Sequence, residues 1–444
     1  MSSLKENTAK TSISAKTSDA QTLKSQAEPA RTWTREAIEQ QLKLERFDYQ
    51  RVPLPFGLAT EGHDRSSTAA EIFGDDLAGK SVLDVGASLG FFCFEAEKRG
   101  ATDVVGIDVH PESVRKARLL AEMKGSQAQF VVGNLESTYL DRKFDQVFCL
   151  NVLHHLHDPI AALNRLIDIT KEKLILEVAT FGAHDKRKVG LPAFICNWLS
   201  RFPIIFVTAT GTRGKREVQR FYMSEKAIFN ILKVHRGVFA KVELKPSGHK
   251  GRFVAIAHKR QIDHLLVVGG PTSSGKKTIM ARFMSNQMPE LAKALGTPDA
   301  TVWGERLNAN HLDKPDDQPV RSHVMLHYDI MRPFMRSTRV YERDEAMDLL
   351  SCAKKITFLT VATPSERLFK QITAAEIDKK FARSGKAKNR HLRIREMYQD
   401  PAKVKEIYST WIDFAKQHSD THWMIEMTSP TEFKLFPADE YVPR

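Results

Sequence analysis

Residues 81–108 read SVLDVGASLGFFCFEAEKRGATDVVGID, and this stretch decides the fold of the first half of the chain. An apolar run, a glycine turn, an amphipathic segment and a second apolar run follow one another in the order of a βαβ nucleotide-binding unit. The glycines let the turn from Gly86 to Gly90 approach a ligand closely. Asp108 ends the second apolar run about 20 residues after the turn, where a carboxylate can accept hydrogen bonds from both ribose hydroxyls.

The segments that follow distinguish this unit from a dinucleotide-binding dehydrogenase, which has a similar turn. A strand at 129–132 runs into the sequence GNLE, and FDQVFCLNVLHHLHDP predicts a fourth strand that ends before Asn151. LILEV predicts a fifth strand that carries Glu177, and residues 242–259 predict a closing hairpin. A terminal hairpin beside a parallel sheet separates the expected fold from that of a dehydrogenase.

Along residues 58–259 the sequence resembles the class I S-adenosylmethionine-dependent methyltransferases, with VLDVGASLG and LNVLHHLHDP as its specific motifs. Within that family it looks most like the branch that includes the tRNA wobble-uridine methyltransferases, which also contains small-molecule and glycan methyltransferases. The resemblance implies methyl transfer with S-adenosylmethionine as cofactor. It also implies cofactor contacts from residues of the turn and the strand ends: Asp84, Gly86, Gly90, Asp108, Asn134 and Asn151.

Histidines after the fourth strand are candidates for a general base. Methyl transfer depends mainly on positioning, but an oxygen acceptor must also lose its proton. His154, His155 and His157 follow the carboxyl edge of the sheet, where open α/β sheets bind ligands. We expect His154 or His155 to be catalytic. The alternative is that the pair packs against and caps the following helix.

An insertion at 181–236 precedes the closing hairpin, and we expect it to form an acceptor-binding cap. It contains KRK at 186–188 and a second basic stretch, in which Arg216, Arg220 and Tyr222 would contact an anionic acceptor. It also contains three aromatic residues: Trp198, Phe202 and Phe206. These form the core of the cap, which we favour, or they line the acceptor pocket or meet a lipid surface.

The second half of the chain opens with a phosphate-binding pattern. HLLVVGG predicts a strand that runs into GPTSSGKKT, which is close to GxxxxGK[ST], a loop whose backbone N–H groups cradle phosphates. Lys277 stands where Ser or Thr should hold magnesium, and Thr278 comes one position late. We expect nucleotide contacts from six residues: Gly270, Ser274, Gly275, Lys276, Lys277 and Thr278.

VMLHYD predicts an apolar strand that ends in Asp329, which would order magnesium-bound water or act as a base. This half resembles the P-loop kinase superfamily, which implies ATP and Mg²⁺, with Lys276 and Asp329 catalytic and Thr278 and Asp329 at the metal. Arginines near 383–395 resemble a kinase lid, or belong to a solvated helix. Because Lys277 would also suit a donor without magnesium, a sulfotransferase and a nucleotide sensor stay open.

The bulk properties fit two doubly wound α/β domains, since the 444 residues are 42% hydrophobic and domains run to roughly 100–200 residues. We expect a disordered tail at 1–30, a methyltransferase domain at 31–260 and a P-loop kinase-like domain at 261–444. The four scattered cysteines fit neither a disulfide framework nor a zinc site. Without an apolar run of about 20 residues, we expect a cytoplasmic protein with peripheral contact to the inner membrane face as an option.

The net charge of +13 points to an anionic partner, such as RNA, an anionic lipid surface, a phosphorylated glycan or the nucleotide cofactors themselves. Our interpretation is a bifunctional methyltransferase and ATP-dependent kinase that modifies a cell-surface glycan or a lipid-linked saccharide. The alternative is a tRNA methyltransferase with an ATP-using or nucleotide-sensing second domain. The absence of a recognised RNA-binding module and the spread of the basic residues disfavour RNA.

Overall fold

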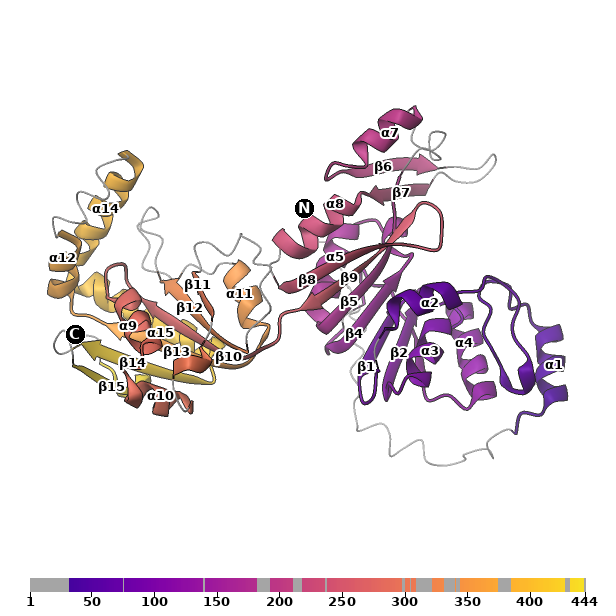
Figure 1. Cartoon of the computed structure of the whole chain (residues 1–444), viewed down its shortest axis with the longest axis horizontal. Coiled ribbons are helices and arrows are strands. Elements are labelled where there is room, and N and C mark those ends of the chain that lie inside the picture. The colour runs from indigo at the N-terminus through magenta and orange to yellow at the C-terminus, as the bar shows by residue number, and fades with distance from the viewer. Residues whose placement is uncertain are drawn as a thin grey trace, which may run out of the picture. The chain divides into compact units, whose positions relative to one another are not determined.

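The structure is a computed structural model of the chain (Figure 1). It describes residues 32–74, 76–138, 140–181, 192–210, 218–235, 238–297, 300–303, 305–308, 322–330, 340, 344–373, 385–427 and 432–442. Several sequence predictions lie outside these residues: the tail at 1–30, the basic run at 186–188, Arg216 and Arg383.

The chain divides into two compact units, each described by itself below. The first comprises Met1–Leu232 and Lys241–Lys259, and the second comprises Lys233–Ala240 and Arg260–Arg444. The domain boundary near residue 260 stays a prediction for truncation to test.

The first unit is built on a seven-stranded mixed sheet. Its strand order is β3-β2-β1-β4-β5-β9-β8, and β9 runs antiparallel to β5 while the pairs from β3 to β5 are parallel. The strands are β1 (Ser81–Val85), β2 (Asp103–Asp108), β3 (Gln129–Val132), β4 (Phe144–Leu150), β5 (Thr170–Ala179), β8 (Phe239–Pro246) and β9 (Arg252–Lys259). Central strands such as β1 and β4 are buried along nearly their whole length, as expected of parallel strands that are covered on both faces.

Helices flank this sheet, and local signals set their ends. Asp158 caps α5 by accepting from the N–H of Ala161. Helix α4 ends at Gly125, which is left-handed with φ 64°. The helices are α1 (Arg35–Leu44), α2 (Ser66–Ile72), α3 (Phe91–Lys98), α4 (Pro111–Lys124) and α5 (Pro159–Ile169). The described part of the insertion forms α7 (Ala193–Leu199), the antiparallel pair β6 (Ile205–Thr210) and β7 (Val218–Met223), and α8 (Glu225–Phe229).

The second unit has a six-stranded sheet in the order β11-β12-β10-β13-β14-β15. The strands are β10 (Ile262–Gly270), β11 (Glu305–Asn308), β12 (His323–Asp329), β13 (Ala353–Ala362), β14 (Thr421–Met427) and β15 (Phe433–Pro437). Neighbours from β11 to β14 are parallel. From the sequence alone, HWMIEM within β14 is predicted as the last strand of this half, and this is wrong because β15 pairs antiparallel beyond it. Five residues ending in proline carry too little periodicity to be recognised as a strand.

The helices of the second unit are α9 (Lys276–Met284), α10 (Pro289–Leu295), α11 (Asp344–Leu350), α12 (Ser365–Thr373), α14 (Gly385–Tyr398) and α15 (Pro401–His418). Trp411 of α15 is buried over β10, where a Cβ on Gly269 would lie 2.1 Å from the indole. The indole N–H donates to Thr360 Oγ1 at 2.6 Å. The glycine therefore makes room for the helix against the sheet.

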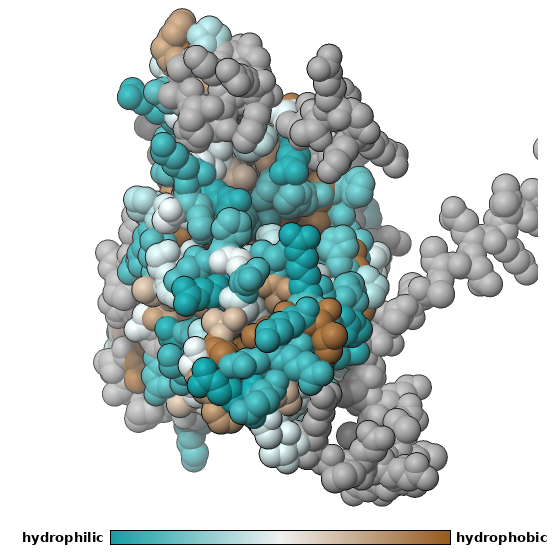
Figure 2. Space-filling model, turned by 90° about the vertical axis from the view of Figure 1, so that its right-hand side faces the viewer, coloured by the Kyte–Doolittle hydropathy of each residue, from teal (hydrophilic) through white to brown (hydrophobic). Residues whose placement is uncertain are grey.

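The described surface carries scattered rather than continuous apolar areas in the view of Figure 2, where hydrophilic side chains cover most of the visible coloured face. Of the helices that the structure describes, none is long and apolar enough to cross a membrane.

Candidate active site

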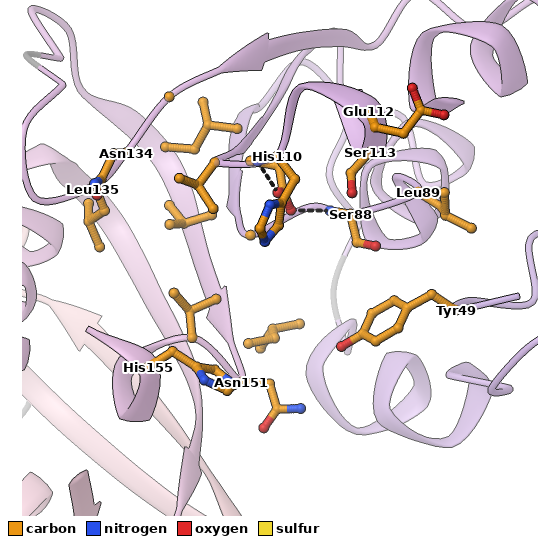
Figure 3. A pocket seen from close by; sticks show the side chains of 18 of the residues that line it. Tyr49, Ser88, Leu89, His110, Glu112, Ser113, Asn134, Leu135, Asn151 and His155 are labelled. Atoms are coloured by element: carbon orange, nitrogen blue, oxygen red, sulfur yellow. Dashed lines mark hydrogen bonds between the residues drawn. The ribbon is translucent and has the colours of Figure 1, made fainter. Parts of the chain in front are cut away.

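A pocket of about 680 Å³ lies at the carboxyl edge of the first sheet (Figure 3). The ends of β1, β2 and β4 and the loop after β3 all contribute to its wall. The predicted site residues that line it are Gly86, Asp108, Asn134, Asn151 and His155. The structure thus brings together five residues that are spread over 70 positions of the sequence.

The glycine turn has its backbone fixed by β2. The N–H groups of Gly86 and Ala87 both donate to the carbonyl of Ile107, at 2.8 and 3.0 Å. Gly86 has a φ of +78°, and a Cβ there would lie 2.4 Å from Val152 Cγ2. Only glycine combines this conformation with such a close wall.

Asp108 anchors the turn from the end of β2. One carboxylate oxygen accepts from the N–H of Ser88 and the other from the N–H of His110, both at 2.9 Å (Figure 3). The side chain lines the pocket although the residue is only 8% exposed. Each oxygen keeps a second lone pair that can accept from a ligand hydroxyl.

Two asparagines take different positions in the pocket. The Asn134 side chain accepts from the N–H of Glu136 at 2.9 Å, which fixes the loop after β3. Asn151 has a left-handed backbone with φ 70°, and its N–H donates to the carbonyl of Glu177. Its side-chain oxygen is buried without a hydrogen-bond partner in the described structure. An unsatisfied buried acceptor costs about 1–3 kcal/mol, so this site calls for a ligand that donates.

Asp84 and Gly90, also predicted to contact cofactor, do not line the pocket. Asp84 is 1% exposed beneath the turn and lies 3.8 Å from the Cys93 thiol. Burial, with a smaller contribution from Asp108, raises the pKa of Asp84 to about 7. Gly90 begins α3, where a Cβ would collide with the ring of Phe130. Both residues therefore belong to the packing around the glycine turn and not to the pocket wall.

The first two histidines after β4 lie in different environments. His154 and His155 belong to a short 3₁₀ turn, Leu153–His155, with ring centroids 4.0 Å apart. His154 is 6% exposed and does not line the pocket, whereas His155 does. Loss of solvent around the ring, followed by the charges of Arg220 and Arg252, lowers the pKa of His155. A neutral imidazole at the pocket wall has the protonation state that a general base needs.

Sequence reasoning missed Gln50, which is buried at 4% exposure. Its side-chain oxygen accepts from the N–H groups of Leu89 and Phe91 at 3.1 and 3.4 Å, so it closes the glycine turn from the other side. Tyr49 next to it lines the pocket. No local pattern marks these residues, because the contacts join segments about 40 positions apart in the sequence.

The insertion corrects two expectations. Tyr222, predicted to contact an anion, is buried at 6% exposure in a small cluster with Ala179 and Phe181. Trp198 and Phe202, which we favoured as core, are 58% and 43% exposed. The strand alternation of β7 explains the first result, because it turns Arg220 and Tyr222 to the same face, where Tyr222 meets the apolar end of β5.

A second glycine turn follows β10 in the other unit. The register pairs Gly270 with Asp329 of β12, so the turn and this carboxylate end side by side. Lys276 is 3% exposed, and its ammonium lies 2.8 Å from Asp329 Oδ1. The same ammonium donates to the carbonyls of Gly270 and Pro271 at 2.9 and 2.7 Å.

The remaining residues of this turn differ in burial and in hydrogen bonding. Ser274 is buried and its hydroxyl has no hydrogen-bond partner, as is true of the Thr272 hydroxyl. The Tyr398 hydroxyl donates to the carbonyl of Thr272 at 2.7 Å. Lys277 and Thr278 are exposed on the first turn of α9. Within the described residues no cluster of three or more His, Cys, Asp or Glu could hold a metal, so the magnesium assignment to Thr278 and Asp329 stays a prediction.

Comparison with known proteins identifies the first unit. The family described as "Methyltransferase domain" matches residues 76–223. The ubiquinone biosynthesis O-methyltransferase of Erwinia tasmaniensis is 30% identical over 189 residues, which cover 36% of this chain and 77% of that protein. The chain belongs to the S-adenosylmethionine-dependent methyltransferases.

Other methyltransferases show weaker or shorter likeness. The tRNA U34 carboxymethyltransferase of Campylobacter hominis is 34% identical over 170 residues, or 33% of this chain and 60% of that protein. The N-terminal domain of EvdMO1, solved with SAH and D-fucose, has a TM-score of 0.39 and 18% identity over 52% of this chain and all of that one. The magnesium protoporphyrin IX methyltransferase of Synechocystis, with bound SAH, has a TM-score of 0.32 and 24% identity, covering 44% and 81% of the two chains.

The pocket of this methyltransferase fits its cofactor. Its volume of about 680 Å³ falls in the range of about 300–1,000 Å³ that small-molecule sites occupy. Asp108 offers a carboxylate to hydroxyl groups, and the unpartnered Asn151 oxygen offers an acceptor to an N–H or O–H donor. Val85 and Leu150 supply apolar parts of the pocket wall. When bound, S-adenosylmethionine supplies an activated methyl group.

Proposed function

We propose that this methyltransferase is a bifunctional transferase. The first unit methylates a hydroxyl group, and the second unit transfers a phosphoryl group from ATP, with a cell-surface glycan or lipid-linked saccharide as the acceptor. One observation carries the proposal: the chain has two glycine turns at strand ends, one beside the Asp108 carboxylate and one beside the Lys276 ammonium. These charges suit the hydroxyls of a nucleoside and the phosphates of a nucleotide.

In the methyltransferase unit, His155 is the group that takes the acceptor proton. S-adenosylmethionine would supply the methyl group to the acceptor oxygen and leave as S-adenosylhomocysteine, while the acceptor proton would pass to the imidazole of His155. The lowered pKa of His155 keeps it neutral and ready to accept that proton. His154, whose ring lies 4.0 Å from His155 between centroids, holds that ring in place.

In the second unit, the strand order supports phosphate transfer. Strand β10, which carries the turn, lies between β12 and β13, so Asp329 stands next to Gly270 at the carboxyl edge. Lys276 would contact the terminal phosphates, and Mg²⁺ held by Asp329 and Thr278 would neutralise their charge. The acceptor oxygen would form the new bond to phosphorus as ADP leaves, and the acceptor proton would pass to water.

The named relatives are an O-methyltransferase of ubiquinone biosynthesis and a carboxymethyltransferase of tRNA U34. A saccharide offers hydroxyls for both reactions. The exposed rings of Trp198 and Phe202, with centroids 4.8 Å apart, offer faces for sugar rings or a lipid carrier at the membrane surface. The second candidate acceptor is tRNA, favoured by the 34% identity to the U34 enzyme and the charge of +13.

Radiolabel transfer tests the proposal. Purified protein is incubated with methyl-labelled S-adenosylmethionine or γ-labelled ATP, together with a polysaccharide fraction, a lipid-linked saccharide fraction or total tRNA. We expect both labels in one saccharide fraction. Methyl label in tRNA alone would replace the saccharide with the second candidate. ATP binding without transfer to any fraction would leave a nucleotide sensor in place of the kinase.

A further inference from the structure

A second cavity of about 370 Å³ lies beside the cofactor pocket of the first unit and shares Tyr49 and Asn151 with it. Its other lining residues are basic or contain imidazole: His63, Arg65, His249, Lys250 and Arg252. None of the described residues that line it is acidic. A ligand that spans the shared wall would therefore reach from a cationic cavity into the methyl-transfer pocket.

Arg65 is the most buried cation of this cavity, with a side chain 9% exposed. Its Nη1 lies 2.7 Å from His249 Nε2, which accepts the hydrogen bond. Its Nε is buried without a hydrogen-bond partner in the described structure. Loss of solvent and the charge of Arg65 lower the pKa of His249, which keeps the ring neutral. A buried guanidinium with an unpartnered N–H group destabilises the fold unless a ligand accepts a hydrogen bond from that group.

One carboxylate serves two guanidinium groups here. Glu177 of β5 is 1% exposed, and its Oε2 lies 3.9 Å from Arg65 Nη1 and 3.8 Å from Arg252 Nη1. Charged hydrogen bonds are usually about 2.7–2.9 Å long, so neither contact is one. The other oxygen of Glu177 accepts from the Ser247 hydroxyl at 2.6 Å. If the arginines served only to neutralise Glu177, we would expect them at hydrogen-bond distance.

A third guanidinium adds to the positive charge near this cavity. Arg220 of β7 has a buried Nε without a hydrogen-bond partner, and its charge helps to lower the pKa of His155. Glu71 of α2 approaches Gly248, but no described ion pair joins it to these arginines. Arg65 and Arg252 thus share Glu177 as their described carboxylate partner, and Arg220 adds to this excess of positive charge in a partly desolvated place.

We infer that this cavity binds an anionic group of the methyl acceptor, a carboxylate or a phosphate, held by Arg65 and Arg252 with Arg220 on the side of His155. The acceptor hydroxyl then extends past Asn151 toward His155 and the cofactor pocket. The inference rests on methyl transfer by the first unit and does not depend on phosphate chemistry in the second. Such an anchor would select acceptors that carry an anion at a fixed distance from the reacting oxygen.

Equilibrium binding of small aromatic probes tests this anion site. The protein is saturated with S-adenosylhomocysteine, and Lys276→Ala is titrated beside it so that phosphate bound at the second turn is recognised. Phenyl phosphate, benzoate and neutral phenol are titrated by calorimetry. We expect one or both anions to bind at least about tenfold more tightly than phenol, and Arg252→Gln to abolish that preference.

The control is Arg142→Gln, because Arg142 pairs with Asp103 on the surface, 48% exposed and outside the cavity. It should leave the preference for anions unchanged. Arg220→Gln is a second test should Arg252→Gln lose affinity for S-adenosylhomocysteine. Preference for phenyl phosphate over benzoate would indicate a phosphorylated acceptor, and the reverse a carboxylate. Equal binding of phenol and both anions, with S-adenosylhomocysteine still bound, would overturn the inference, whereas loss of methyl transfer in the unmodified protein would count against the proposed function instead.

Discussion

The two glycine turns are built alike, but a carboxylate lies beside the first and an ammonium beside the second. In each, a glycine with positive φ lies at or directly after the end of a central parallel strand, Gly86 at 78° and Gly270 at 154°, and a helix begins a few residues later. The first turn directs N–H groups toward a carboxylate, because Ser88 donates to Asp108. In the second, Lys276 donates to carbonyl oxygens of its own turn. The partner charge, rather than the turn, decides which ligand each unit can bind.

The turns also differ in how many hydrogen bonds of their charged side chain are already made within the protein. Asp108 uses one lone pair of each oxygen on the backbone and retains acceptors for a ligand. The ammonium of Lys276 has all three of its donors matched, by Asp329 and by the carbonyls of Gly270 and Pro271. The first site therefore has acceptors free for a ligand, whereas a phosphate group at the second would have to displace the present partners of Lys276.

The largest effect is expected from substitutions at the second turn. Lys276→Ala and Asp329→Asn should each lower phosphate transfer by about two orders of magnitude or more, because both groups act on charge that develops in the transition state. ATP binding should change less, and methyl transfer should continue. Initial rates with γ-labelled ATP and with methyl-labelled cofactor, from one preparation, measure both effects. A matching loss of methyl transfer would mean that the variants damage the whole chain.

Removal of the carboxylate at the first turn should have the next largest effect. Asp108→Ala should weaken S-adenosylmethionine binding about 10–100-fold, since a charged hydrogen bond contributes about 1.5–3 kcal/mol. Calorimetry measures the affinity. Asp103→Ala, at the other end of β2, is the matched control, because Asp103 pairs only with the exposed Arg142 among the described ion pairs. Unchanged affinity in Asp108→Ala would remove this residue from the site.

The two units should respond oppositely to acid through their buried groups. Burial lowers the pKa of His264 and His422 in the second sheet to about 4. Between pH 6.5 and 4 the unfolded chain binds these protons first, so stability present above pH 6.5 is lost as the pH falls. Burial raises the pKa of Asp84 in the first unit to about 7, so its contribution is present below pH 4 and is lost as the pH rises through 7.

Thermal unfolding from pH 4.5 to 7.5 measures this difference. We expect His422→Gln to flatten the acid loss in the second unit and Asp84→Asn to flatten the alkaline loss in the first, each by several degrees in melting temperature. Parallel pH curves for wild type and both variants would contradict the assignment.

A smaller effect is expected from Lys277→Ser, which restores the usual residue type at the magnesium position. Because Lys277 and Thr278 are both exposed, we expect phosphate transfer to stay within about threefold or to rise. A fall of tenfold or more would indicate that Lys277 replaces charge that the metal supplies elsewhere. Titration with Mg²⁺ separates the two results, since only a metal ligand shifts the magnesium dependence.

The smallest effect is expected from removing the second unit. A chain ending at Lys259 should fold and bind S-adenosylmethionine within about twofold of the full chain, because the first sheet is complete at β9. Circular dichroism and calorimetry measure the outcome. The segment Lys233–Ala240, which belongs to the second compact unit, makes this a demanding test of the boundary. An insoluble fragment would show that the two cores depend on one another.

The sequence was most informative where the signals are local. A glycine turn after an apolar strand, a proline at the start of a helix or a carboxylate at a strand end each depend on a few neighbouring residues, and Gly86, Asp108 and Lys276 were found in this way. Gln50, Arg252 and His249 were not assigned to the site. Their roles depend on contacts across as many as 184 positions, such as Arg65 to His249, which local periodicity does not encode.

Asn151 lines both cavities of the first unit, and its side-chain oxygen has no described partner. Two ligands that meet at one amide are thermodynamically linked. If cofactor fixes this side chain in the orientation that the acceptor requires, then the acceptor must tighten cofactor by the same factor. The enzyme would then bind cofactor and acceptor cooperatively, whichever of the two binds first.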